Sequence, residues 1–472
     1  AMSMPTCGRP CLDVHVVDVN GYLDTGPMST LEEQMRCRAV GAWFLDYLDQ
    51  PVMASLPLLP PEVERQLSFQ SGQERLAITF RFPVNAKSGA VDIDAGEHFE
   101  SIVKCHSLCT YEEAEELINT PDSKAASATL QLLLKATTKL EHQAAEEGWT
   151  CIFEHLEPNF IQAGQGFSGG VVASRIIAGC SYLVNRYAGK ELSKAQLWSE
   201  IVQPNSECPK KVTMPLYIHA RPDPIARRAA LQLLVQCGQK PPAEGTDLRV
   251  KDVIKALRGV LGQKALNTRQ KQCLQSAFLR QVRNFMPSAG YRVGTSSHFP
   301  LQTRSTQPDA NASLFSGSQV FHVVNPLRRY LDILGLRVLK MAGGWRPRQL
   351  HMILSPAQLE EAVLRTNMRQ EACHFAQGIF RQISLMRAVE PAGWLVNDAV
   401  VASVSQASFQ VLAPVGSKAG ILLSLPVAAL RNASCTAEFF PEDCSLAMTC
   451  YQAQELAPFQ GARAQWTIAP WG

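Results

Sequence analysis

The sequence predicts an α+β protein in two parts, a mixed region over residues 1–390 and a small β-barrel over residues 391–472. Three observations carry this prediction. Short apolar runs bounded by turn residues fill the N-terminal third, which is typical of strands. Apolar residues recur at intervals of three and four through the middle of the chain, which is typical of helices. After Gly393 the pattern returns to short runs separated by glycines, as in a small barrel.

The first two strands are expected at Leu12–Val19 and Leu76–Phe82, where apolar residues alternate or cluster between turn residues. From Tyr111 to Gly148 the apolar spacing becomes helical. Thr110, followed by the acids Glu112, Glu113 and Glu115, is typical of a helix N-terminus. This segment therefore predicts one or two helices.

The middle of the chain is expected to be mostly helical. The predicted helices are Gly170–Tyr187, Ile225–Gln236, Val250–Leu261, Lys271–Phe285, Arg328–Met341 and Pro356–Met386. Gly294–Gln319 is rich in Ser, Thr, Pro and Asn and predicts a long loop. The strands expected in the C-terminal barrel are Asp398–Val404, Ser408–Ala413 and Ala419–Leu425.

Length and composition favour a large folded core. The chain has 472 residues, of which 46% are hydrophobic and 18% charged, enough for more than one domain. The most apolar stretch, Gly169–Val184, is interrupted by Arg175, so no membrane span is expected. The first ten residues lack the basic region and apolar core of a signal peptide. The fourteen cysteines are therefore expected to be mostly buried thiols of an intracellular protein.

Charge is distributed unevenly, although the formal net charge is only +3. Asp13–Asp49 contains seven acidic residues against two arginines, whereas Arg249–Arg283 contains nine Lys or Arg against one Asp. A second basic cluster is formed by Arg328, Arg329, Arg337, Lys340, Arg346 and Arg348. Such runs are most often solvated helix faces, but two of them together favour an anionic polymer as partner.

Two short motifs suggest other chemistry. Gly166–Gly170 matches the G-x-S-x-G nucleophile elbow, with Ser168 as a candidate acyl-transfer nucleophile. The strand expected before this motif is weak, and no oxyanion segment is found in the sequence. A glycine-rich start of a helix is therefore the favoured interpretation. A zinc site is the second alternative. Its candidate ligands, against the commoner interpretation as buried thiols, are Cys7, Cys11, Cys105, His106 and Cys109.

The most informative segment follows Phe321. Pro326 is predicted to open a helix, with Arg328 and Arg329 in its first turn. Because cations are unfavourable at the positive end of a helix dipole, this position indicates an anionic partner. Two guanidiniums beside a helix start would bind a phosphodiester, and one would stabilise the charge that develops on cleavage. The alternative is an ion pair with Asp or Glu of a neighbouring helix.

These residues resemble the RNB-type catalytic domain of the ribonuclease II family, which includes RNase II, RNase R and exosome-associated exoribonucleases of eukaryotes. Asn325-Pro-Leu-Arg-Arg-Tyr330 is similar to the family's Ser-Pro-Ile-Arg-Arg-Tyr. Further similar blocks occur in the family's order at His15–Tyr22, Leu56–Pro60, Glu74–Thr79, Thr110–Ala114 and His298–Leu301. Val396–Leu430 resembles the OB-type RNA-binding barrel that ends family members.

The resemblance implies a mixed sheet packed with helices around an RNA channel, followed by the OB-type barrel. It implies a 3′-to-5′ exoribonuclease that hydrolyses single-stranded RNA processively to nucleoside monophosphates with two Mg ions. Arg328 would be the catalytic arginine. Phe153 and Phe44, or else Trp43, would stack on bases, and the remaining RNA contacts would be Arg329, Tyr330 and His298.

The sequence also departs from the family pattern. The family's metal-binding aspartates would stand ahead of Ala1, so no metal ligand is assigned in this chain. Ala178 and Gly179 occupy the positions of two family glutamates, one of which holds the 3′ nucleotide, and Leu336 replaces a histidine. These departures motivate a second hypothesis, a catalytically dead RNA-binding or scaffold module within a larger assembly.

Overall fold

The computed structural model describes most of the N-terminal region and separate segments of the rest. Described are residues 2–3, 10–22, 30–45, 51–85, 87–119, 125–146, 171–193, 213–219, 289–295, 321–342, 354–389, 400–404, 407–415, 418–426, 428, 435–440, 445–451 and 463–468. The three helices predicted between residues 225 and 285 lie outside these ranges.

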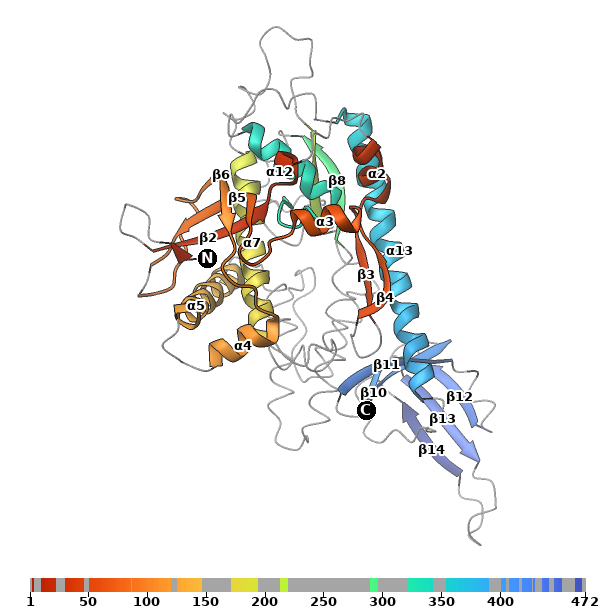
Figure 1. Ribbon diagram of the computed structural model, residues 1–472. Helices are drawn as coiled ribbons and strands as arrows, with labels where there is room; N and C mark the ends of the chain where they lie inside the picture. The colour runs from red at the N-terminus through yellow and green to blue at the C-terminus, as the bar shows by residue number, and fades with distance from the viewer. Residues whose placement is uncertain are drawn as a thin grey trace, which may run out of the picture.

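A four-stranded antiparallel sheet begins the fold (Figure 1). Its order is β1 (Met2–Ser3), β2 (Cys11–Val17), β5 (Glu74–Pro83) and β6 (Glu97–Lys104). The predicted strands at residues 12–19 and 76–82 are confirmed, except that the first leaves the sheet after Val17. Residue 18 still donates its N–H to Leu76 O at 3.0 Å, but the chain then turns into the short helix α1 (Val19–Tyr22).

Five described elements connect β2 to β5. They are α1, α2 (Thr30–Arg38), the hairpin of β3 (Ala42–Leu45) with β4 (Pro51–Leu56), and α3 (Pro61–Leu67). Pro61 starts α3, where its missing N–H costs nothing because the first N–H groups of a helix have no partner within the helix. This excursion from the sheet carries Glu32, a buried acid of α2.

The next described helices along the chain are α4 (Tyr111–Asn119), α5 (Ala125–Glu146) and α7 (Val171–Ser193). The predicted helices at residues 111–148 and 170–187 are confirmed. Thr110 and Glu113 form a reciprocal cap, with Thr110 N donating to Glu113 Oε2 at 2.7 Å and Glu113 N to Thr110 Oγ1 at 3.2 Å. Among the described helices, none combines the length and apolarity that crossing a bilayer requires.

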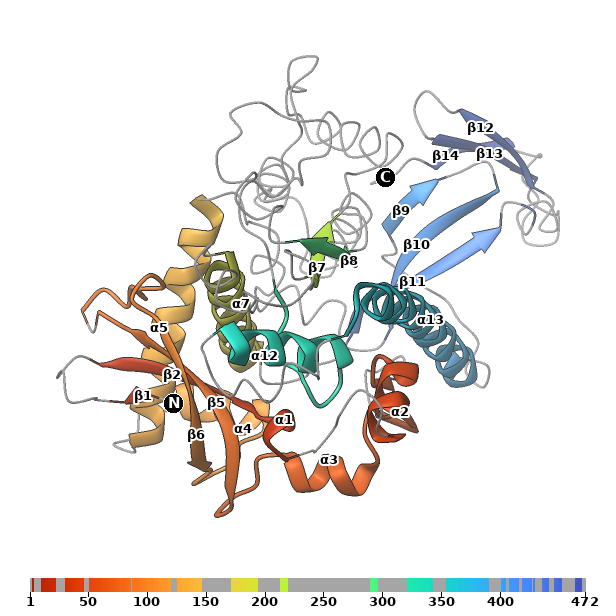
Figure 2. The ribbon, with the colours of Figure 1, turned by 90° about the horizontal axis from the view of Figure 1, so that it is seen from above.

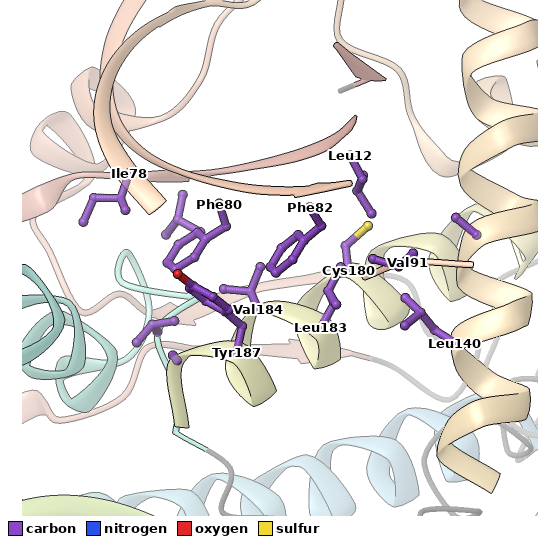
Figure 3. Close-up of a cluster of buried hydrophobic side chains, with 14 of the residues drawn as sticks. Leu12, Ile78, Phe80, Phe82, Val91, Leu140, Cys180, Leu183, Val184 and Tyr187 are labelled. Carbon is purple, nitrogen blue, oxygen red and sulfur yellow. The ribbon is translucent and has the colours of Figure 1, made fainter. Parts of the chain in front are cut away.

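The main core lies between the sheet and helices α5 and α7 (Figure 3). Phe80 and Phe82 project from β5 toward Tyr187 of α7, whose ring meets Phe82 edge-on at 5.3 Å between centroids. Burial of each large side chain stabilises the fold by about 1.5–3 kcal/mol. The Tyr187 hydroxyl lies 2.9 Å from His98 Nδ1 on β6, so the polar end of this core residue also has a partner.

A second layer contains α12 (Tyr330–Ala342), α13 (Pro356–Val389) and the hairpin of β7 (Thr213–His219) with β8 (Ala289–Thr295). Seen from above, α12 lies between α7 and α13 (Figure 2). The predicted helix at 356–386 is confirmed. The loop predicted from Gly294 starts too early, because Gly294 pairs with Met214 in the hairpin; residues 296–319 lie outside the described ranges.

The elements described in the C-terminal segment are strands (Figure 1). They are β9 (Val400–Val404), β10 (Ser408–Val415), β11 (Lys418–Pro426), β12 (Cys435–Phe440), β13 (Ser445–Tyr451) and β14 (Arg463–Ile468). The three predicted strands are confirmed. The described strands pair in two sheets, β11-β10-β9 and β12-β13-β14, so the closed barrel and the boundary at residue 390 stay predictions.

Two members of the predicted basic cluster are buried in α12. Arg337 donates from Nη1 and Nη2 to the two carboxylate oxygens of Glu32, each at 2.7 Å. Lys340 Nζ lies 2.7 Å from both Asp18 Oδ2 and Glu100 Oε1. The prediction that these two cations contact an anionic polymer is therefore wrong. They neutralise acids of the N-terminal excursion and the sheet instead.

His15 makes the stability of the sheet depend on pH. Its Nδ1 lies 2.8 Å from Thr79 Oγ1, and burial lowers its pKa from the ordinary 6.5 to about 4. Between these values the unfolded chain binds the proton and the folded chain does not, so stability falls as the pH drops from 6.5 toward 4. We expect a loss of about 1–3 kcal/mol, measured by urea unfolding, that a His15→Gln variant does not show. Parallel losses in the two proteins would contradict this assignment.

Candidate nucleic-acid interface

The two arginines singled out by the sequence lie in a turn ahead of α12. Asn325 O accepts the N–H groups of Arg328 at 3.1 Å and Arg329 at 3.0 Å. Arg328 O then accepts Gly41 N–H at 2.7 Å, and residue 329 forms an antiparallel bridge with Val40. The prediction of both arginines in the first helical turn is wrong, because Arg328 O bonds across to residue 41 and α12 begins only at Tyr330.

The turn is anchored on both sides. On the helix side, Asp332 Oδ2 accepts Asn325 N–H at 2.8 Å. On the other side, Tyr330 N–H donates to Ala39 O at 2.9 Å. A Cβ atom on Gly41 would lie 3.0 Å from Leu58 N and 3.6 Å from the Arg328 Cα, so the absence of a side chain allows this close approach. The backbone therefore holds the arginines in one place.

The Arg329 side chain is held by residues that the sequence did not identify. Its Nη1 lies 3.2 Å from His322 Nδ1, and the Tyr291 hydroxyl lies 2.7 Å from the same nitrogen. A guanidinium can only donate, so His322 Nδ1 accepts. Tyr291 is fixed in turn by Asn367 of α13, which bonds its backbone N–H and C=O, each at 2.8 Å. Only the fold brings these segments together, so sequence spacing carried no signal.

Arg328 is a half-buried cation. Burial and the neighbouring Arg329 lower its pKa, whereas Asp332 opposes this shift. Within the described part of the chain, no acceptor lies within hydrogen-bond distance of its guanidinium. A desolvated guanidinium without a hydrogen-bonded acceptor is suited to an anionic ligand.

The other predicted RNA contacts are placed differently. Tyr330 is fully buried and donates its hydroxyl to Glu32 Oε1 at 2.5 Å. Phe44 is buried and stacks on Phe380 of α13, with 5.0 Å between ring centroids. Both side chains are thus held in the protein interior in this structure. Trp43 lies in β3 opposite Ser55. Outside the described residues lie Phe153, His298 and the alternative nucleophile Ser168.

The described residues do not fit a two-magnesium site. Within these ranges, no three His, Cys, Asp or Glu residues gather in a way that would hold a metal ion. Both oxygens of Asp13 accept bonds from Arg81, at 2.8 and 3.0 Å, and Asp18 pairs with Lys340. We therefore derive no chemical step through magnesium.

The alternative zinc site finds no support in the described ranges either. Cys11 is buried in β2 and Cys109 is exposed. Cys7 lies outside the described residues.

Gly179 lies where α7 packs tightly against α5. A Cβ atom there would be 2.8 Å from Thr137 Cγ2 and 2.9 Å from Thr137 Cβ. Thr137 cannot easily turn away, since it is buried and its hydroxyl donates to Leu133 O at 2.9 Å. A glutamate at position 179 would therefore require the two helices to separate.

Gly179→Ala should destabilise the fold by about 1–2 kcal/mol, because overpacking outweighs the gain of about 1 kcal/mol in helix propensity. Gly378→Ala is the matched control, since a Cβ on this glycine of α13 meets nothing within 4 Å. It should leave stability unchanged or raise it. Thermal melts of both variants test this, and a Gly179→Ala protein as stable as the control would disprove tight packing at this position.

Comparison with known proteins identifies the fold. The family model described as RNB domain matches residues 7–343. Among solved structures, Mycoplasma genitalium RNase R in complex with ribose methylated single-stranded RNA is similar with a TM-score of 0.66 and 12% identity, over 99% of this chain and 66% of that chain. Yeast Ssd1, a pseudonuclease, gives 0.67 and 16%, over 95% of this chain and 49% of that one.

The Dss1 exoribonuclease active site mutant D477N from Candida glabrata is similar with a TM-score of 0.58 and 15% identity, over 93% of this chain and 50% of that chain. The chain thus spans half to two-thirds of the length of these proteins. None of the curated protein sequences compared with the chain matches it. The family resemblance of the sequence is nevertheless confirmed, and because the domain model covers most of the residues, the chain belongs to the RNB domain family.

Proposed function

We propose that this chain is the nuclease part of a divergent RNase II-type 3′-to-5′ exoribonuclease, which hydrolyses single-stranded RNA processively to nucleoside monophosphates. The observation that carries the proposal is Arg328, a half-buried guanidinium held by its backbone in an RNB fold and offered no acceptor by the described residues. The similarity to RNase R in complexes with single-stranded and double-stranded RNA supports RNA as the ligand.

Arg328 would donate to the scissile phosphodiester and stabilise the charge that develops on its oxygens. Arg329, tied to His322, would add a fixed positive charge beside it. Base stacking by Phe153 and by Phe44 or Trp43, and a contact from His298, remain proposals from the family resemblance. An OB-type barrel over residues 391–472 that adds affinity for RNA is also a proposal from the family resemblance.

Magnesium is proposed as the cofactor on the same resemblance. The described residues do not supply its ligands. Other domains or subunits of a larger complex are proposed as partners.

A second candidate function is RNA binding without cleavage. Gly179 favours it, because the tight approach of Thr137 leaves no space for a glutamate at this position. The family has glutamates at the positions of Ala178 and Gly179, and one of that pair holds the terminal nucleotide. The similarity to Ssd1, a pseudonuclease, is consistent with this candidate.

The test is degradation of 5′-labelled single-stranded RNA by the full-length protein with magnesium. We expect stepwise shortening from the 3′ end and a rate that falls by about 100-fold in Arg328→Ala. Arg365→Ala, which removes a partly exposed arginine paired with Glu361 on α13, is the control and should keep the rate. Intact RNA that is bound in a salt-dependent way would support the second candidate. RNA that is neither bound nor cut would contradict both.

A further inference from the structure

Residues 321–323 form a fixed segment ahead of the turn that carries the two arginines. Phe321 and Val323 are both buried in the main core, and Val323 N–H donates to Asn185 Oδ1 of α7 at 3.1 Å. Gly335 of α12 approaches the same segment so closely that an added Cβ atom would lie 2.6 Å from the His322 carbonyl oxygen. The backbone that carries the half-buried His322 side chain is therefore held by two helices.

The imidazole ring of His322 is fixed by Tyr291 of β8. The two rings meet edge-on, with 5.6 Å between their centroids and 81° between their planes, and the Tyr291 hydroxyl lies 2.7 Å from His322 Nδ1. Tyr291 is 2% exposed, and Asn367 of α13 bonds both of its backbone groups. The direction of Nδ1 is therefore set by the protein before any ligand binds.

The hydrogen bonds at Nδ1 determine the protonation state of His322. Arg329 Nη1 lies 3.2 Å from this nitrogen, and because a guanidinium only donates, Nδ1 carries no proton. The Tyr291 hydroxyl must then donate to it as well. An imidazolium has a proton on both ring nitrogens and would accept neither bond, so the arrangement requires His322 to be neutral.

A neutral acceptor affects Arg329 differently from a carboxylate. An aspartate or glutamate beside the guanidinium would bind it tightly but would cancel its charge toward a phosphate. The imidazole nitrogen instead holds one end of the planar guanidinium without adding a negative charge. Arg329 is thus oriented by a partner that does not reduce its charge.

We propose that His322 is the positioning residue of the second arginine: as a neutral acceptor, it fixes the Arg329 guanidinium in one direction for contact with an RNA phosphate and leaves the charge of the guanidinium available for binding. This inference rests on the proposed RNA binding by Arg328 and Arg329 and identifies what organises it. Tyr291 and Asn367 hold the imidazole in place.

The test compares His322→Asn with His322→Asp, because Oδ1 of either side chain is as many bonds from the Cα atom as Nδ1 is. Asparagine supplies a neutral acceptor, and aspartate supplies the same acceptor with a negative charge. Binding of a 5′-labelled single-stranded RNA to the full-length protein is titrated at several salt concentrations, with EDTA in place of magnesium. We expect His322→Asn to bind within about twofold of wild type. His322→Asp should bind about threefold to tenfold more weakly, with a salt slope shallower by about 0.7, the value for one phosphate contact on a single strand.

A third variant, His322→Leu, removes the acceptor. Arg329 then has to be ordered when RNA binds, so we expect affinity to fall by about twofold to tenfold with an unchanged salt slope, since no charge is lost. The same change in an Arg329→Gln background should cause no further loss, because it acts only through this guanidinium. Circular dichroism checks the folding of each variant, and if His322→Leu does not fold, the Asn and Asp variants still decide the inference.

Two results would overturn the inference: equal affinities and salt slopes for His322→Asn and His322→Asp, or a loss from His322→Leu that is as large in the Arg329→Gln background as in wild type. A merely structural role would weaken binding in all three variants without changing the salt slope. Failure of the proposed exoribonuclease is distinguishable, because wild-type protein that binds RNA but leaves it intact with magnesium would contradict cleavage and not the role of His322. Wild-type protein that does not bind RNA would contradict both.

Discussion

Glu32→Ala should lower the free energy of unfolding by about 3–5 kcal/mol, the cost of leaving a buried charge without its partner. Glu32 is 1% exposed and accepts three hydrogen bonds, two from Arg337 and one from Tyr330. Arg337, also 1% exposed, would lose this bidentate partner and keep the bond from its Nε to Asn20 Oδ1 at 2.7 Å. Urea unfolding followed by circular dichroism measures the loss.

The comparison with a surface pair makes the test specific. Glu33 is the neighbouring acid of α2 and pairs with Arg36 at 3.1 Å, but it is exposed. Glu33→Ala should therefore cost less than about 0.5 kcal/mol. The double variant Glu32→Leu/Arg337→Met should recover part of the stability, because an apolar pair needs no compensation for desolvation. Equal effects at Glu32 and Glu33 would contradict the importance of burial.

Gly335→Ala should destabilise the protein by about 3 kcal/mol, at the upper end of overpacking effects. A Cβ on this glycine of α12 would lie 2.6 Å from the His322 carbonyl oxygen and 3.0 Å from Phe321 Cε1. The first contact is backbone, so neither a rotamer change nor a small side-chain shift relieves it. Helix α12 would have to move away from the segment that carries His322.

Because His322 contacts Arg329, the same change should weaken RNA binding. Thermal melts and RNA titrations of the variant measure the two effects. Gly378→Ala serves again as the control with open space around the added methyl group. A Gly335→Ala protein that melts at or above the wild-type temperature would show that α12 and residues 321–323 are not in close contact.

Local patterns were sufficient for some of the regular elements. Short apolar runs predicted β2 and β5, and Thr110 ahead of three acids predicted the start of α4, because both signals depend on residues close in sequence. The start of α12 was not predictable in this way. A backbone bond from Gly41 to Arg328 decides it, and no pattern near residue 328 reveals that partner.

Only some residues of the candidate site were predictable from the sequence. Arg328 and Arg329 were found because a paired motif in sequence marks them. His322, Tyr291 and Asn367 escaped detection, since their contacts join a strand, a helix and a loop that are distant in sequence. Arg337 and Lys340 were misinterpreted for a related reason. A cation at helical spacing has the same pattern whether it faces solvent or a buried acid from another segment.

The buried ion pairs also constrain the order in which the molecule can form. Glu32 and Arg337 are 305 residues apart, and Asp18 and Lys340 are 322 apart. Closing loops of this size is entropically costly and slow, and proteins dominated by such contacts fold late and through intermediates. During synthesis, the acids of the N-terminal excursion must stay hydrated until α12 leaves the ribosome. The turn that carries Arg328 and Arg329 is bonded to residues 39–41 and would form only at that stage. A nascent chain would therefore lack the folded candidate RNA-binding site.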